Sequence, residues 1–219
     1  DDSKWAKAAL KRTPYGKLIP QNGPADRITA RFEPVEFEKT DSLIRVKFPV
    51  EVSGWVALKN IKAERGQQIS IKYLSESPGN GANTYTAKGT GDESYHARFT
   101  WFVFSEVEIR GIDNLTAEQV EAHAVNSDVE KSGLFETSNE LINKINQIWQ
   151  RSQLDNMHGG VASDCPHRER SAYTGDGQVT CNAVLTILDA RRLYEKWMQD
   201  IADGQDVLSG HIQYTAPYI

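Results

Sequence analysis

Three features that would place this sequence in a specialised class of protein are missing. Only two cysteines, Cys165 and Cys181, occur in 219 residues, and no CxxC or Cys/His spacing of a zinc site is present. No run approaches the ~18 apolar residues of a membrane-spanning helix. The 25 Lys and Arg residues are outnumbered by 30 Asp and Glu residues and form no basic stripe. These absences argue against a disulfide framework, a membrane span and a nucleic-acid partner. A single bridge between the two cysteines stays open, but we favour buried free thiols.

The remaining composition is that of an ordinary globular chain. Hydrophobic residues make up 39% of the sequence, and 16 glycines are also ordinary. The length suits one large domain or two small ones, at ~100–200 residues per domain. The chain starts at Asp1 without Met and stops at Ile219 after a loop-like stretch, so we expect a processed or truncated chain.

Residues 26–129 show the alternation of apolar and polar side chains that is typical of half-buried β-strands. Several short strands separated by turns predict an antiparallel β-sandwich. Residues 1–25 are interpreted as a tail or linker, in which a short helix over residues 1–11 stays open. The expected strands cover residues 43–48, 54–58, 68–74, 98–104, 106–110 and 119–125.

From residue 130 to residue 219 the hydrophobic period becomes helical. Thr137 and Glu140 have the spacing of a capping box, which predicts a helix start there. A second helix is expected from Gly177 to Asp203, ending at Gly204. Each helix carries more apolar surface than the other can bury, so we expect the rest of a helical domain to cover it. The expected inward-facing residues are Leu141, Ile142, Ile145, Ile148 and Trp149 in the first helix, and Val184, Leu185, Leu188, Leu193, Trp197 and Ile201 in the second.

The loop between these helices carries an unusual density of charge. Residues 164–176 read DCPHRERSAYTGD and hold three carboxylates and two guanidiniums in 13 residues. Close carboxylates raise one pKa while a neighbouring Arg lowers another, and a glycoside-hydrolysing site needs such a split between an acid and a base. A solvated loop of ion pairs is the competing interpretation of the same composition.

The loop resembles the signature of the family 78 α-L-rhamnosidases, which is close to DCPHRER followed by LGWTGD. Three upstream blocks agree with that family in order, and the resemblance covers roughly residues 17–219. It implies a β-sandwich followed by the first helices of an (α/α)6 catalytic barrel, in which terminal α-L-rhamnose is removed by inverting hydrolysis. The blocks are GWVALKNIKAERGQQISIKYLSE, YHARFTWFVFSEVEIRG and SDVEKSGLFETSNELINKI.

The same resemblance assigns roles to individual residues. Glu169 matches the general acid, and the general base lies later in the barrel, where this chain has no counterpart. Asp164, Arg168 and Asp176 match residues that line the rhamnose subsite, with Asp176 also counted in the catalytic group. Tyr173 stands where the family has a Trp that packs on the sugar. We also place His167 of the motif and His158, just before it, among the candidate substrate-binding residues, although a structural role for His158 is the stronger alternative.

The motif departs from the family at Ser171, Ala172 and Tyr173, and this keeps other functions open. A lyase could cleave a rhamnose-α-1,4-glucuronate linkage by β-elimination with Tyr173 as base. A degenerate enzyme and a non-catalytic carbohydrate-binding sandwich are further alternatives, and exposed Trp55 and Trp101 would favour the sandwich.

Several other aromatic and histidine side chains carry weaker expectations. Trp55, Trp101 and Trp149 are interpreted as packing anchors, and His96 and His123 as surface or satisfied core residues. His211 and Tyr214 would reach the barrel mouth if the chain returns there. No cofactor and no transition metal are expected, with only an incidental Ca²⁺ left open. The implied partner is a rhamnose-containing oligo- or polysaccharide, which favours a periplasmic or secreted protein of bacterial type.

Overall fold

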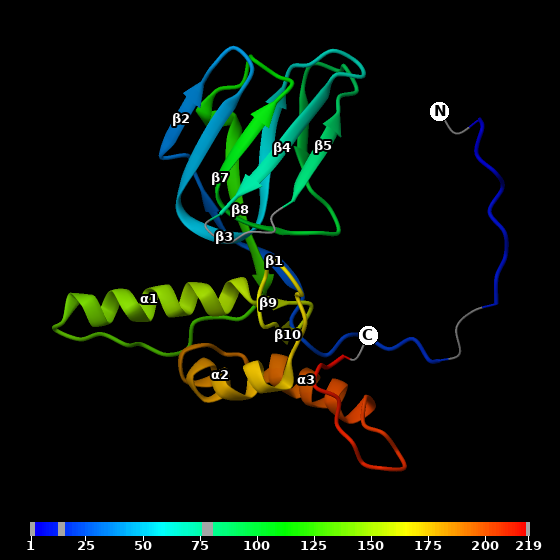
Figure 1. The fold of residues 1–219 in the computed structure, drawn as a ribbon, viewed down its shortest axis with the longest axis vertical. Helices are drawn as coiled ribbons and strands as arrows, with labels where there is room; N and C mark the ends of the chain where they lie inside the picture. Colours follow the sequence, from blue (N-terminus) through cyan, green and yellow to red (C-terminus); the bar gives the residue numbers. More distant parts are fainter. Residues whose placement is uncertain (1–2, 13–15, 76–80, 218–219) are drawn as a thin grey trace.

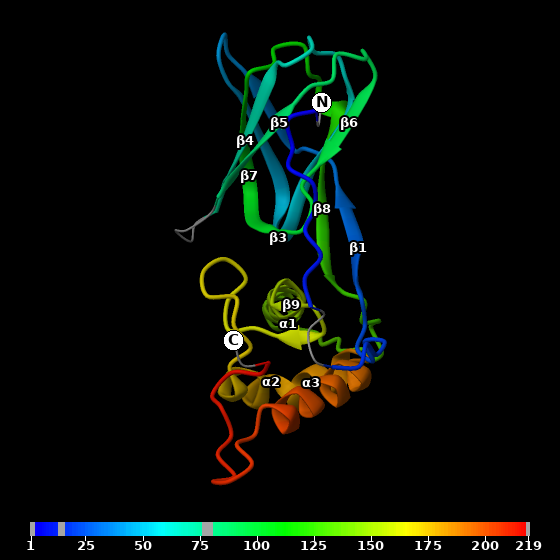
Figure 2. The same cartoon turned by 90° about the vertical axis from the view of Figure 1, so that its right-hand side faces the viewer.

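The computed structural model describes residues 3–12, 16–75 and 81–217. A β-sandwich is followed by three helices, and α1 lies between the sandwich and the α2–α3 pair (Figures 1 and 2). This confirms the fold class expected from the sequence. Residues 3–12 contain no helix, and residues 1–2 of the open helical stretch lie outside the described residues. No helix in the described segments is long and apolar enough to cross a membrane.

The sandwich is one curled antiparallel sheet with the strand order β1-β8-β3-β7-β4-β5, and β2 and β6 pair with β3. Its inward side chains form a continuous core that includes Tyr73, Phe104, Leu58 and Ile109, each at most 1% exposed. The strands are β1 Asp26–Phe32, β2 Glu36–Lys39, β3 Ile44–Ile61, β4 Gln68–Leu74, β5 Ala82–Thr86, β6 Glu93–His96, β7 Phe102–Arg110 and β8 Val120–Ser127.

Strand β3 runs through both halves of the curled sheet. The prediction of two separate strands over residues 43–48 and 54–58 is therefore wrong. The first part of β3 pairs with β2 and β7, and its later part pairs with β8 and β6. The register with β7 shifts between Lys47 and Val52, so Pro49 lies in an irregular stretch where its missing N–H is tolerated. At Gly54 a Cβ atom would lie 1.9 Å from the carbonyl oxygen of His123, so only glycine lets β8 approach this closely. The expected strand over residues 98–104 begins only at Phe102.

Helix α1 (Glu140–Asp155) begins two residues later than the predicted capping box implies. Asn139 is the N-cap, and its side chain accepts hydrogen bonds from the backbone N–H groups of Leu141 and Ile142. The Thr137 hydroxyl instead donates to the carbonyl oxygen of Asn139, so the proposed Thr137–Glu140 box is wrong. The expected apolar face lies in solvent: Leu141, Ile142, Ile145 and Ile148 are 44–68% exposed.

The predicted second helix is two helices, α2 (Thr174–Ile187) and α3 (Arg191–Asp203). Backbone hydrogen bonds that would continue α2 go to another segment: Gly133 N–H donates to Ile187 O, and Asp189 N–H donates to Glu130 O. A Cβ atom on Gly133 would lie 2.2 Å from the Thr186 carbonyl oxygen, so glycine permits this approach. The helices share a second core that includes Val184, Leu193 and Trp197, whereas Leu185 is 43% exposed. Gly204 ends α3 as predicted.

Candidate active site

The charged motif forms a loop between the short strand β10 (Val161–Ala162) and α2. Asp164 closes this loop on itself. Its backbone N–H donates to the carbonyl oxygen of Ser171 at 3.0 Å, and its carboxylate accepts the Ser171 N–H at 3.1 Å. Residues 165–170 therefore project from a fixed base.

Trp101, directly before β7, fixes the loop to the sandwich. Its indole Nε1–H donates to the carbonyl oxygen of Pro166 at 3.0 Å. The Arg170 guanidinium lies 4.8 Å over the Trp101 ring and donates to the Trp101 carbonyl oxygen at 2.9 Å. Arg170 has a φ of 55°, a left-handed conformation that costs energy for a residue with a side chain, and these contacts hold it there. Trp101 therefore packs against the motif loop, in agreement with its interpretation as a packing anchor.

Glu169 projects from the loop with 46% of its side chain exposed. The Cys165 thiol donates to its carboxylate at 3.0 Å, and the Arg168 Nε lies 3.6 Å away. The thiol hydrogen bond is the largest of several interactions that lower the Glu169 pKa, and Arg168 acts in the same direction. A general acid has to carry its proton at the working pH. Exclusion of water by a bound sugar would move the pKa of this carboxyl upward.

Asp164, Cys165 and Glu169 bring their ligand atoms within 4.8 Å of one another. The thiol of Cys165 serves as a hydrogen-bond donor to Glu169, and the Arg168 guanidinium lies beside the same carboxylate. A protonated thiol and an adjacent cation both disfavour a metal ion at this position. Both cysteines are free thiols, Cys165 being buried and Cys181 half-buried.

Asp164 and Asp176 line one hollow of about 420 Å³ together with Asn156 and Ser152 of the α1 end. Asp176 is exposed in the first turn of α2. The hollow thus presents two carboxylates and neutral polar groups, which are the acceptors and donors that sugar hydroxyls require. The structure brings Asp164 close to Glu169 and into one hollow with Asp176.

Tyr173 is the N-cap residue of α2, and the chain returns to it from the end of the described segment. Tyr173 pairs with Thr215 as an isolated β-bridge, and the Thr174 N–H donates to the Tyr214 carbonyl oxygen at 2.9 Å. The Tyr173 and Tyr214 rings are nearly parallel, with centroids 6.0 Å apart. The chain therefore returns to α2 at Tyr214, and the expectation that His211 and Tyr214 reach a barrel mouth stays a prediction. His211 is exposed.

His167 and His158 do not line the hollow that Asp164 and Asp176 share. His167 lines a separate hollow between α1 and the sandwich. His158, in the short strand β9 (Met157–His158), is only 5% exposed, and its Nε2 lies 2.7 Å from the Ser53 hydroxyl. Its ring stacks on Trp101 with centroids 4.0 Å apart. The burial and contacts of His158 are those expected of the structural alternative, and its place among the substrate-binding candidates stays a prediction.

The sequence interpretation did not single out Asp155 and Ser53, which form a buried hydrogen bond. Asp155, the last residue of α1, is buried and accepts the Ser53 N–H at 2.8 Å. Burial raises the pKa of Asp155 to about 7, against the opposing effects of the Ser53 hydrogen bond and of Arg151. An Asp at the end of an amphipathic helix carries no local signal for burial, because the partner Ser53 is 102 residues away in the sequence.

Known proteins are similar to this chain in sequence and in fold. Residues 130–219 match the family described as the bacterial alpha-L-rhamnosidase 6 hairpin glycosidase domain. An alpha-L-rhamnosidase of Formosa agariphila is 31% identical over 96% of this chain, and one of Streptomyces avermitilis is 31% identical over 56% of it. The alpha-L-rhamnosidase structure from Dictyoglumus thermophilum superposes with a TM-score of 0.89 over 99% of the chain at 32% identity.

The fold and the loop therefore define a β-sandwich joined to the start of a helical glycosidase domain. These similarities support the resemblance to the family 78 α-L-rhamnosidases that the motif predicted. It spans 24% of the length of the Formosa relative and 26% of the Dictyoglumus structure.

Proposed function

We propose that the whole protein removes terminal α-L-rhamnose from a plant or microbial glycan by inverting hydrolysis, with Glu169 as general acid. The observation that carries the proposal is the loop that presents a half-exposed Glu169 next to Asp164, with Asp164 also facing the hollow that Asp176 lines. The rhamnosidase relatives support the same reaction class.

In this mechanism Glu169 protonates the glycosidic oxygen as the bond to the anomeric carbon breaks. A second carboxylate at ~6.5–9.5 Å removes a proton from water, which attacks the opposite face of the sugar. The family resemblance puts that base later in the barrel, so we assign it to none of the motif carboxylates. Asp164, Asp176 and Arg168 hold the rhamnose hydroxyls in the proposal, and Tyr173 packs on the ring.

In this proposal Trp101 and Arg170 contribute to catalysis by positioning the loop that carries Glu169. They hold the segment that contains Glu169 against the sandwich, which limits the geometries that the acid can adopt relative to the sugar. Such restriction is a large source of rate enhancement, because misplacement by ~1 Å costs about 100-fold in rate.

An incubation with a rhamnose-capped glucuronate glycan tests the proposal. Free rhamnose and the ultraviolet absorbance of a conjugated uronate are followed together in the same sample. Hydrolysis predicts rhamnose release at constant absorbance. Rising absorbance would replace hydrolysis with the lyase alternative and give the central role to Tyr173, and the absence of both signals would refute either reaction on this glycan.

The non-catalytic sandwich based on Trp55 and Trp101 stays an alternative, because both side chains are half-buried and line one hollow. Trp101 contacts His158, Arg170 and Pro166, and Trp55 stacks on His96 with centroids 5.2 Å apart.

Because a glycan of this kind occurs outside the cell, we propose that the protein is periplasmic or secreted. Detection of the protein in fractionated cells of its source tests the location.

A further inference from the structure

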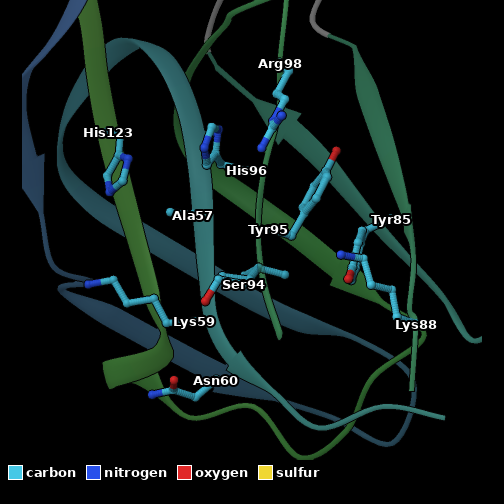
Figure 3. Close-up of a pocket in the computed structure, with 11 residues that line it drawn as sticks. Ala57, Lys59, Asn60, Tyr85, Lys88, Ser94, Tyr95, His96, Arg98 and His123 are labelled. Atoms are coloured by element: carbon cyan, nitrogen blue, oxygen red, sulfur yellow. The ribbon is translucent and has the colours of Figure 1, made fainter. Parts of the chain in front are cut away.

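The sandwich carries a hollow that is separate from the candidate active site. Its volume is about 950 Å³, and it opens where β6 and β8 flank the later part of β3 (Figure 3). Ala57 has the shortest side chain of the β3 residues that line it, and it is paired with His96 of β6. A small side chain between larger neighbours leaves the depression in the sheet surface.

Positive charge gathers around this hollow. Arg98 and Lys88 are exposed in its lining and make no ion pair with any residue that the structure describes. Lys59 is the third cation, and it is neutralised by Glu121. The nearby Glu93 carboxylate is turned inward, where it accepts hydrogen bonds from Tyr85 and from the backbone N–H groups of residues 88–90. Two uncompensated cations therefore face the hollow.

The hollow also contains a hydrogen-bond acceptor without a donor among the described residues. His123 is 7% exposed, and its Nε2 bonds to the Glu121 carboxylate at 3.1 Å, so Nε2 carries the proton. Its buried Nδ1 has no partner among the described residues. Burial lowers the pKa of His123, which favours the neutral ring and leaves Nδ1 as an acceptor. The His96 Nδ1 lies 2.8 Å from the Ala97 carbonyl oxygen, so Nδ1 is the donor in this contact.

An aromatic side chain completes the lining. The Tyr95 ring is half-buried and stacks on Tyr85 with centroids 4.6 Å apart, which holds it in place. Figure 3 shows Tyr95 and His96 beside Arg98. Ring faces that stack, acceptors for hydroxyl hydrogens and unpaired cations are the three kinds of group that an acidic sugar uses.

We propose that this hollow is a second binding site, specific for a pyranose that carries an anionic group, either a carboxylate or a sulfate. Arg98 and Lys88 bind the anion, His123 accepts a hydrogen bond from a sugar hydroxyl, and Tyr95 supports the ring. The site retains an acidic glycan on the sandwich independently of bond cleavage at Glu169. Binding at this second site does not depend on the proposed hydrolysis.

An oligosaccharide array tests the site with the whole protein. The array carries neutral, uronate-bearing and sulfated saccharides with otherwise matched backbones, and binding is measured at low and moderate salt. The double variant R98A/K88A is compared with K62A/K72A, which removes two exposed cations elsewhere on the sandwich. Thermal unfolding of both double variants confirms that the fold is intact.

The expected result is preferential binding of acidic saccharides, weakened about tenfold in R98A/K88A and by less than about twofold in K62A/K72A. Binding of the uronate set alone or of the sulfated set alone identifies the anion. Equal binding of acidic and neutral saccharides, or equal losses in the two double variants, would overturn the proposal.

Two further measurements separate this site from the proposed function. E169Q is expected to keep acidic saccharide binding unchanged, because Glu169 does not line the hollow. R98A/K88A is expected to keep its rate on a small aryl α-L-rhamnoside. Loss of binding in E169Q would also contradict a separate site.

Discussion

The guanidinium of Arg170 lies over the ring of Trp101 and donates a hydrogen bond to the carbonyl oxygen of the same residue, 69 positions earlier in the sequence. Arg170 directly follows Glu169, so this contact connects the sandwich to the candidate acid. The sandwich therefore serves as a support that sets where the motif loop can present its carboxylate.

Arg170→Ala is expected to lower kcat by about 10- to 100-fold with a smaller effect on KM, because the substituted side chain no longer fixes the segment that carries Glu169. Arg170→Lys is the matched control. A lysine ammonium can also lie over an indole ring and donate to a carbonyl oxygen, so it should recover most of the rate. Steady-state kinetics on a rhamnoside measures both effects. An unchanged kcat in the Ala variant, or equal losses in both variants, would show that Arg170 does not position the acid.

Cys165→Ala is expected to shift the pH dependence of activity. The thiol hydrogen bond to Glu169 stabilises the ionised carboxylate and lowers its pKa. Removal of this donor raises the pKa, so Glu169 keeps its transferable proton to a higher pH and the basic limb of kcat/KM moves upward. Cys181→Ala changes the other free thiol and should leave the limb in place. Coincident basic limbs in the two variants would contradict this role for Cys165.

Asp155→Asn is expected to flatten part of the pH dependence of stability. Burial raises the folded-state pKa of Asp155 from 3.8 to about 7, so between these values the folded protein holds a proton that the unfolded chain releases. Stability contributed by Asp155 therefore falls as pH rises through this window and is constant above it. The Asn oxygen can still accept the Ser53 N–H but has no proton to lose.

The measurement is the unfolding temperature of the whole protein at several pH values between about 4 and 8. Parent and Asp155→Asn should diverge as pH rises, with the parent losing more stability. Asp41→Asn, at an exposed position, serves as the control. Parallel curves for the parent and Asp155→Asn would rule out a raised pKa at this position.

The sequence predicts the elements of this fold better than their junctions. Alternation and helical period depend on neighbouring residues, which is why the strand and helix regions were found. The continuity of β3 past Pro49 depends on a register shift with β7, and the break after Ile187 depends on hydrogen bonds to residues 130–133. Neither partner is local, so neither junction leaves a local pattern.

The candidate site shows the same difference between local features, which the sequence predicts, and non-local contacts, which it does not. The motif places Asp164, Glu169 and Asp176 within 13 residues, and the structure brings Asp164 close to Glu169 and into a shared hollow with Asp176. The supporting contacts of Trp101, Ser53 and Asp155 join segments that are far apart in the chain. Composition leaves His158 with two interpretations, and its burial and its stack on Trp101 join segments that are far apart in the chain.

The proton of Glu169 is the central claim, and E169Q tests it most directly on two substrates. One is a rhamnoside with an aliphatic leaving alcohol, which needs protonation, and the other is a dinitrophenyl rhamnoside, whose leaving group does not. The account predicts a loss of about 10²- to 10⁴-fold on the first substrate and a far smaller loss on the second. Activity on the first substrate within about threefold of the parent, or equal losses on both, would contradict Glu169 as the general acid.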